Sequence, residues 1–177
     1  MKKGPGKPMS GQIAEGWKKA LMNEVEGREF YRMAAANARL DGVRQIFTFL
    51  MEEEERHRKA ILEQIGRMGE GKPPRPVRKA TGKREIRKFQ SPLFSPDFVA
   101  RGKNVEGEAA ALSIGMTLEK RAIEQFGALR KKLKGDAAAE KIVGDLIEWE
   151  REHLEILTRQ YEGLREMYWE EARFWPF

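Results

Sequence analysis

The chain contains two histidines, and each of them lies three residues after a glutamate. The two pairs are Glu54–His57 and Glu150–His153. Residues three apart on an α-helix share a face, so each pair can present a carboxylate and an imidazole to one metal ion. One turn to either side of the pairs, the same faces carry apolar residues: Leu50, Ile61, Leu146 and Leu157. Both pairs are therefore predicted to face the interior of a helical protein.

Apolar residues recur at helical spacing through most of the chain, and no alternating strand pattern persists. We predict an all-α fold with four helices, at about Gln12–Leu40, Asp41–Met68, Val105–Leu133 and Ala137–Arg173. Short breaks separate the first helix from the second and the third from the fourth, and Asp41 and Asp136 are expected to cap the helices that follow them. Helices joined by such short turns pack as antiparallel hairpins, so the predicted architecture is a four-helix bundle of two hairpins with a long crossover connection.

The chain is predicted to form one bundle domain over residues 12–173. The predicted parts are a disordered lead-in (1–11), a first hairpin (12–69), a crossover (70–104), a second hairpin (105–173) and an aromatic tail (174–177). Prolines spread through the crossover forbid a long helix there. The crossover is expected to pass over its own bundle or to a neighbouring chain, and a homodimer is expected.

The crossover holds much of the positive charge of the chain, whose net charge is +6. Ten Lys or Arg residues lie between Lys72 and Lys103, against Glu85 and Asp97. The simplest interpretation is a solvated basic loop; docking of an acidic electron donor and weak contact with nucleic acid are the alternatives. The aromatic residues of the crossover follow its basic run instead of interleaving with it, so no specific nucleic-acid partner is expected.

The sequence contains no cysteine. This excludes disulfides, zinc ribbons, iron–sulfur clusters and a rubredoxin-type iron site within these residues, and it fits a cytoplasmic protein. Met1–Gly11 has no apolar core, so no signal peptide is expected. No run of about 18 apolar residues occurs, so no membrane span is expected either.

The two predicted hairpins are copies of each other. A shift of 95 residues places Glu24 over Glu119 and Tyr31 over Phe126. A shift of 96 residues places the first Glu-x-x-His motif over the second. Each hairpin therefore supplies one inward-facing glutamate from its first helix and one Glu-x-x-His motif from its second helix.

Four carboxylates facing the interior of a bundle need compensation, because an unpaired buried carboxylate costs several kcal/mol or becomes protonated. Two divalent metal ions would balance the four charges, with both imidazoles neutral. Oxygen-rich ligation with two imidazoles suits iron or manganese, and the lack of thiolates argues against a structural zinc site. Helical bundles with ligand sets of this composition are known to hold two iron or two manganese ions.

Over Ile13–Leu164 the chain resembles the rubrerythrin-type diiron proteins of the ferritin-like superfamily. The resemblance rests on six ligand positions in the family's order and on Tyr31, which follows Glu24 by seven residues as in that family. It implies a ferritin-like bundle with two iron ions, or two manganese ions, held by Glu24, Glu54, His57, Glu119, Glu150 and His153. It also implies an oxidoreductase of oxidative-stress defence that reduces peroxide or dioxygen, or oxidises Fe²⁺. The alternative is a non-catalytic protein of the same fold that binds or buffers the metal.

The chain departs from rubrerythrins in three ways. It has no rubredoxin-type site, so a separate electron-donor protein is expected. Rubrerythrins carry an extra carboxylate one turn after the glutamate of their third helix, where this chain has Ala122. Its six-ligand set therefore resembles the symmetrical site of bacterioferritins. The counterpart of Tyr31 in the second hairpin is Phe126, which has no hydroxyl.

These differences predict two inequivalent metal positions. Tyr31 is expected either to pack in the core or to hydrogen-bond a ligand carboxylate of the first hairpin, whereas Phe126 can only pack. The metal held by the ligands of the second hairpin is therefore expected to be bound more weakly.

Overall fold

The computed structural model describes residues 11–77 and 106–171. Four helices form in these ranges: α1 (Gly11–Asn37), α2 (Asp41–Gly69), α5 (Glu106–Lys132) and α6 (Ala137–Glu171). The described ranges contain no strand, which confirms the prediction of an all-α fold. The helix ends lie close to the predicted ones, and the largest difference is that α1 ends at Asn37 instead of Leu40. No described helix carries an apolar stretch long enough to cross a membrane.

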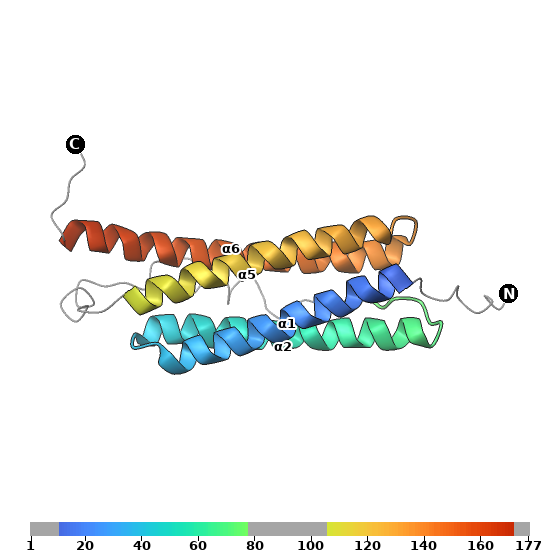
Figure 1. The fold of residues 1–177 in the computed structure, drawn as a ribbon, viewed down its shortest axis with the longest axis horizontal. Coiled ribbons are helices and arrows are strands. Elements are labelled where there is room, and N and C mark those ends of the chain that lie inside the picture. Colours follow the sequence, from blue (N-terminus) through green and yellow to red (C-terminus); the bar gives the residue numbers. More distant parts are fainter. Residues whose placement is uncertain (1–10, 78–105, 172–177) are drawn as a thin grey trace.

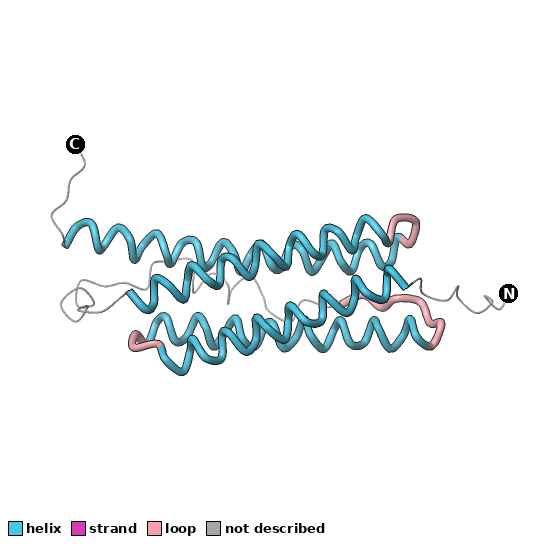
Figure 2. Tube along the Cα trace, viewed as in Figure 1, coloured by secondary structure: helices cyan, strands magenta, loops and turns pink. Residues whose placement is uncertain are grey.

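The helices α1 and α2 form one antiparallel hairpin, and α5 and α6 form the second (Figure 1). The two hairpins pack on each other through α1 and α5, which run in opposite directions. The turns within the hairpins lie at opposite ends of an elongated bundle (Figure 2). This is the predicted four-helix bundle. Most of the expected lead-in, the aromatic tail and the crossover from residue 78 onward lie outside the described residues, so both expected paths of the crossover, over its own bundle or to a neighbouring chain, stay predictions.

The two short turns differ in how they cap the helix that follows. Asp136 caps α6 as predicted, because its Oδ1 atom accepts a hydrogen bond from the backbone N–H of Ala139 at 3.1 Å. Asp41 does not cap α2, and this prediction is wrong. The N-cap of α2 is Leu40, which makes no side-chain cap. Asp41 lies inside the first turn, where its carboxylate accepts a hydrogen bond from Arg44 at 2.7 Å.

Glycines with positive φ angles mark two of the helix ends. Gly71, which follows α2, has a φ of 67°, and Gly135, between α5 and α6, has a φ of 99°. A side chain at either position would strain the backbone, so glycine is the residue that lets the chain turn there. The N–H of Gly71 also donates to the carbonyl of Met68 at 3.1 Å and closes the end of α2.

Two apolar clusters fill the bundle. One lies toward the turn between α5 and α6 and is called the α5–α6-end core. It contains Trp17, Ala20, Ile61, Ala122, Phe126, Leu129, Leu133, Ala139, Ile142, Val143, Leu146, Ile147 and Trp149. The α1–α2-end core contains Tyr31, Ala38, Val43, Ile46, Phe47, Leu50, Leu112, Ile156, Leu157 and Leu164. On every helix, a glutamate or a Glu-x-x-His motif lies between residues of the two cores. These charged residues therefore form a belt across the middle of the bundle.

Candidate metal centre

All four helices contribute to the charged belt. Helices α1 and α5 provide one glutamate each, and α2 and α6 provide one Glu-x-x-His motif each. The belt residues are Glu24, Glu54, His57, Glu119, Glu150 and His153, with exposed fractions of 1% to 4%. The structure thus brings together the six residues that the sequence singles out.

The imidazole of His57 lies among three carboxylates. Its Nδ1 atom is 2.9 Å from Glu150 Oε1, 3.3 Å from Glu24 Oε2 and 3.9 Å from Glu54 Oε2. Glu24 and Glu54 belong to the same hairpin as His57, whereas Glu150 comes from the other one. His57 is therefore surrounded by carboxylates of both hairpins.

The second hairpin repeats this arrangement around His153. Its Nδ1 atom is 3.3 Å from Glu54 Oε1, 3.5 Å from Glu150 Oε2 and 3.6 Å from Glu119 Oε1. The carboxylates of Glu54 and Glu150 are thus shared by the two histidines, each with one oxygen near the Nδ1 atom of either ring. Glu24 and Glu119 are the outer glutamates, each beside the histidine of its own hairpin.

Ligand-type atoms converge in the belt with few hydrogen bonds between them. One such atom from each of Glu54, His57, Glu150 and His153 lies within 4.8 Å of the other three. His57 Nδ1 and Glu150 Oε1 lie 2.9 Å apart but are not aligned as a hydrogen bond, and both oxygens of Glu24 and the Nδ1 atom of His153 likewise lack an aligned hydrogen bond in the described part of the chain. Buried acceptors without partners are unfavourable, and a bound cation would satisfy them. The donor set of carboxylates and imidazoles therefore fits a metal such as iron or manganese.

The protonation of the belt reflects the crowding of its carboxylates. Burial raises the pKa of Glu24, Glu54 and Glu119 well above the ordinary value of 4.5, and repulsion from Glu150 raises it further. Burial also disfavours the charged form of Glu150, but attraction to both histidines outweighs it and lowers the pKa of this carboxyl. Burial likewise opposes the charge of His153, but the surrounding carboxylates raise its pKa above 6.5. Without metal, the belt therefore holds protons that a metal would displace.

Tyr31 reaches from α1 to a glutamate of α5. Its hydroxyl, buried in the bundle, donates a hydrogen bond to Glu119 Oε1, 88 residues away in the sequence. Burial and the nearby Glu119 carboxylate raise the pKa of Tyr31 well above 10.0, so the hydroxyl keeps its proton. The expectation that Tyr31 serves a carboxylate of its own hairpin is therefore wrong. The reason is that α1 packs against α5, which brings the phenol to the other hairpin.

Phe126 and Ala122 provide no comparable contact. Both are buried in the α5–α6-end core, with exposed fractions of 0% and 6%. Their side chains contain no hydrogen-bonding group, and Glu24 has no hydrogen-bond partner among the described residues. The two outer glutamates therefore differ, because Glu119 is held by a phenol and Glu24 is not.

Trp149 is a neighbour of the belt that the sequence did not single out. Its indole stacks on the ring of His57, with 5.1 Å between the ring centroids and 19° between the planes. His57 in turn stacks on His153, with 5.2 Å between the centroids. The sequence signal that could have identified Trp149 is a break in the repeat. A shift of 96 residues places this tryptophan over Glu53, so an aromatic residue stands beside one Glu-x-x-His motif and a charged residue beside the other.

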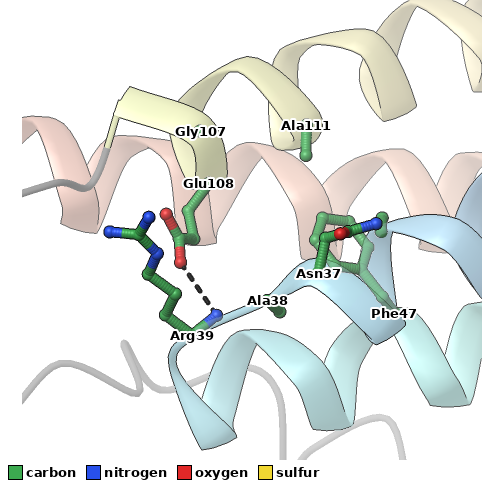
Figure 3. A pocket seen from close by; sticks show the side chains of 8 residues that line it. Asn37, Ala38, Arg39, Phe47, Gly107, Glu108 and Ala111 are labelled. Carbon is green, nitrogen blue, oxygen red and sulfur yellow. Dashed lines mark hydrogen bonds between the residues drawn. The ribbon is translucent and has the colours of Figure 1, made fainter.

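A cavity of about 420 Å³ lies at one end of the bundle, where the first turns of α5 meet the end of α1 (Figure 3). The carboxylate of Glu108 accepts a hydrogen bond there from the backbone N–H of Arg39 at 3.1 Å. Phe47 also lines the cavity, but none of the six belt residues does. This cavity is therefore separate from the candidate metal centre.

Comparison with known proteins agrees with this architecture. The family model described as rubrerythrin matches residues 17–161, a range that covers most of the chain and all six belt residues. No curated protein and no solved structure gives a match. The extent of the family match and the four-helix architecture together establish a ferritin-like bundle. The chain belongs to the rubrerythrin family.

Proposed function

We propose that the charged belt binds two metal ions, preferentially iron, and that the protein is an oxidoreductase. Its reaction would be the reduction of peroxide or dioxygen, or the oxidation of Fe²⁺. The observation that carries this proposal is the convergence of six buried ligand-type side chains, several of whose atoms have no hydrogen-bond partner within the described ranges. Manganese is the alternative metal, because carboxylates with two imidazoles suit both ions.

Charge balance supports two ions instead of one. Four ionised carboxylates carry a charge of −4, and two divalent ions carry +4 when both imidazoles are neutral. A single ion would leave negative charge in the bundle interior, where uncompensated charge is costly. The same balance explains why the family fold can tolerate so acidic an interior.

The geometry suggests how the six residues divide between the two positions. Glu54 and Glu150 would contact both ions, since each has one oxygen on the side of either histidine. Glu24 and His57 would complete the first position, and the corresponding pair of the second hairpin would complete the other. When bound, the iron pair supplies the reversible one-electron redox chemistry that amino-acid side chains lack.

The protein itself orients and shields the centre. The two apolar cores close the belt from both ends and exclude water, which strengthens electrostatic interactions inside. Tyr31 holds its proton at the hydroxyl oxygen and fixes the orientation of Glu119. The ring of His57 stacks on both Trp149 and His153, which restricts its rotation.

The partners follow from the same proposal. The 177 residues contain no cysteine for a rubredoxin-type iron site, so a separate electron-donor protein would supply the electrons. Peroxide, dioxygen or Fe²⁺ would be the substrate. We also propose a homodimer located in the cytoplasm, as the composition and the long crossover led us to expect.

Rapid mixing tests the redox activity. Protein loaded with Fe²⁺ without oxygen is mixed with H2O2 or with O2, and near-ultraviolet absorbance is followed. We expect a rise within seconds as the iron is oxidised. Glu54→Gln should abolish it, whereas Glu52→Gln, on the exposed face of the same helix, should not. Full metal loading without any absorbance change over minutes would instead support a metal-buffering protein, and failure to bind metal would overturn both functions.

A further inference from the structure

The two outer glutamates of the belt receive different support. Glu119 accepts a hydrogen bond from Tyr31, a residue outside the belt, whereas within the described ranges only the belt residues Glu54 and His57 adjoin the carboxylate of Glu24. Hydrogen bonds to a ligand carboxylate orient it before the metal arrives, and their loss commonly weakens metal binding. Glu119 is therefore oriented by a hydrogen bond from outside the belt, and Glu24 is not.

The phenol that holds Glu119 is itself fixed by aromatic contacts. The ring of Tyr31 stacks on Phe47, with 6.0 Å between the centroids and 21° between the planes. The rings of Phe30 and Tyr31 pack edge to face, with 5.4 Å between their centroids. Tyr31 has no exposed surface. Because the ring cannot turn freely in this setting, little conformational entropy is lost when its hydroxyl binds Glu119.

Gly115 leaves room for the phenol beside Glu119. It lies on α5 one turn before Glu119, and a Cβ atom there would be 3.2 Å from Cε1 and 3.3 Å from the hydroxyl oxygen of Tyr31. Leu157 Cδ1 would also be 3.2 Å away, so a side chain at this position would require the phenol and Leu157 to shift by a few tenths of an ångström. The absence of a side chain at Gly115 therefore lets the phenol lie against α5.

The equivalent contact to Glu24, which would come from α5, lacks both the hydroxyl and the glycine. Ala20 stands at the position equivalent to Gly115, and Phe126 stands at the position equivalent to Tyr31. The repeat therefore preserves the ligand types but not their supporting residues. Sequence comparison of the two hairpins shows the missing hydroxyl, but only the packing of α1 on α5 shows which glutamate loses it.

We infer that the two metal positions are inequivalent, that the position beside Glu119 and His153 binds more tightly and fills first, and that Gly115 is a positioning residue for it. This inference rests on the proposed two-metal centre. It reverses the order expected from the sequence, in which the ligands of the second hairpin held the weaker metal. The position beside Glu24 and His57 is then the more labile one.

Calorimetric titration of the metal-free protein with Mn²⁺ tests the order of filling. We expect two separate steps in the parent protein. Tyr31→Phe should weaken the tighter step about 10–100-fold, so that the two steps draw together. Glu24→Gln should remove mainly the weaker step, and Glu119→Gln should remove mainly the tighter one.

Two glycines of α5 provide a matched control for positioning. A Cβ atom at Gly127 would meet nothing within 4 Å, so Gly127→Ala changes helix propensity without touching Tyr31. Gly115→Ala should weaken the tighter step, whereas Gly127→Ala should leave both steps unchanged. In a Tyr31→Phe background, Gly115→Ala should have little further effect on metal binding, because the hydroxyl that holds Glu119 is already absent; only the contacts of the new methyl group with the ring and with Leu157 Cδ1 remain. A full additional loss in that background would show a merely structural role.

The outcomes separate this inference from the proposed function. Two equal binding events that Tyr31→Phe leaves unchanged would overturn the inference and leave the two-metal centre standing. Loss of the weaker step in Tyr31→Phe, with the tighter step intact, would overturn it as well. No Mn²⁺ or Fe²⁺ binding by the parent protein would overturn the proposed function itself.

Discussion

Glu24 and Glu119 show why single residues of a repeat are not interchangeable. Both are buried glutamates of the belt at equivalent positions of the two hairpins. Residue type and helical spacing suffice to place them inside the bundle. They do not reveal their neighbours, because the partner of Glu119 comes from a helix that lies 88 residues earlier in the chain. Residue-level predictions therefore need the packing of the hairpins as well as the sequence.

Replacing Glu24 should stabilise the metal-free protein but weaken metal binding. Glu24→Gln removes a crowded carboxyl, so the metal-free protein should gain stability on the order of 1 kcal/mol. Glu119→Gln should gain less, because Tyr31 then donates to a neutral amide instead of an anion. Urea unfolding of both variants in a chelator measures the difference. Marked destabilisation of metal-free Glu24→Gln would identify Glu24 as a structural residue.

The metal-free protein should become less stable as the pH rises from about 5 to 8. The folded state raises the pKa of Glu24, Glu54, Glu119 and His153, so it binds more protons than the unfolded state in this range and loses stability as they dissociate. The lowered pKa of Glu150 affects stability only below about pH 4.5, so it does not change the direction of the trend between pH 5 and 8.

Thermal melts across this pH range, with a chelator and then with excess Mn²⁺, measure the effect. Metal binding competes with protons, so the metal-loaded protein should show the reverse trend. A melting temperature of the metal-free protein that rises steadily with pH would contradict the assignment.

At the scale of helices, periodicity and helix ends differ in how well the sequence predicts them. The apolar spacing predicts all four described helices, because each must bury one stripe of side chains. The cap of α6 is predicted correctly and that of α2 is not. Both turns offer an aspartate, but the backbone of the first turn places Leu40 at the N-cap, one residue before Asp41. A shift of one residue decides whether a carboxylate can reach the free N–H groups.

The two aspartates therefore form a matched pair for a stability measurement. Asp136→Ala removes the hydrogen bond to the N–H of Ala139 and should cost about 1 kcal/mol of unfolding free energy. Asp41→Ala removes only an exposed ion pair with Arg44 and should cost about 0.5 kcal/mol or less. Urea unfolding of the metal-loaded variants gives both values. Equal losses of unfolding free energy would show that the capping hydrogen bond of Asp136 stabilises the protein no more than the exposed ion pair of Asp41.

At the scale of the whole molecule, the sequence predicts the bundle and the six belt residues because the duplication is visible in it. Two equal hairpins with inward-facing ligands can bury them only by packing face to face. Helical periodicity does not reveal which helices meet, and this is why the prediction for Tyr31 names the wrong hairpin. The contact between α1 and α5 decides that point, and it depends on the fit of the complete surfaces.

The division of the belt between two hairpins has a consequence for the order of folding. Contacts within each hairpin are local in the chain, and such contacts generally form early. The belt exists only after the hairpins dock, because Glu54 and Glu150 each lie beside the histidine of the other hairpin. During refolding, far-ultraviolet circular dichroism should therefore recover before the ability to bind Mn²⁺. Metal present from the start would act on the docking step alone, because it can bind only when the two hairpins, already formed, come together.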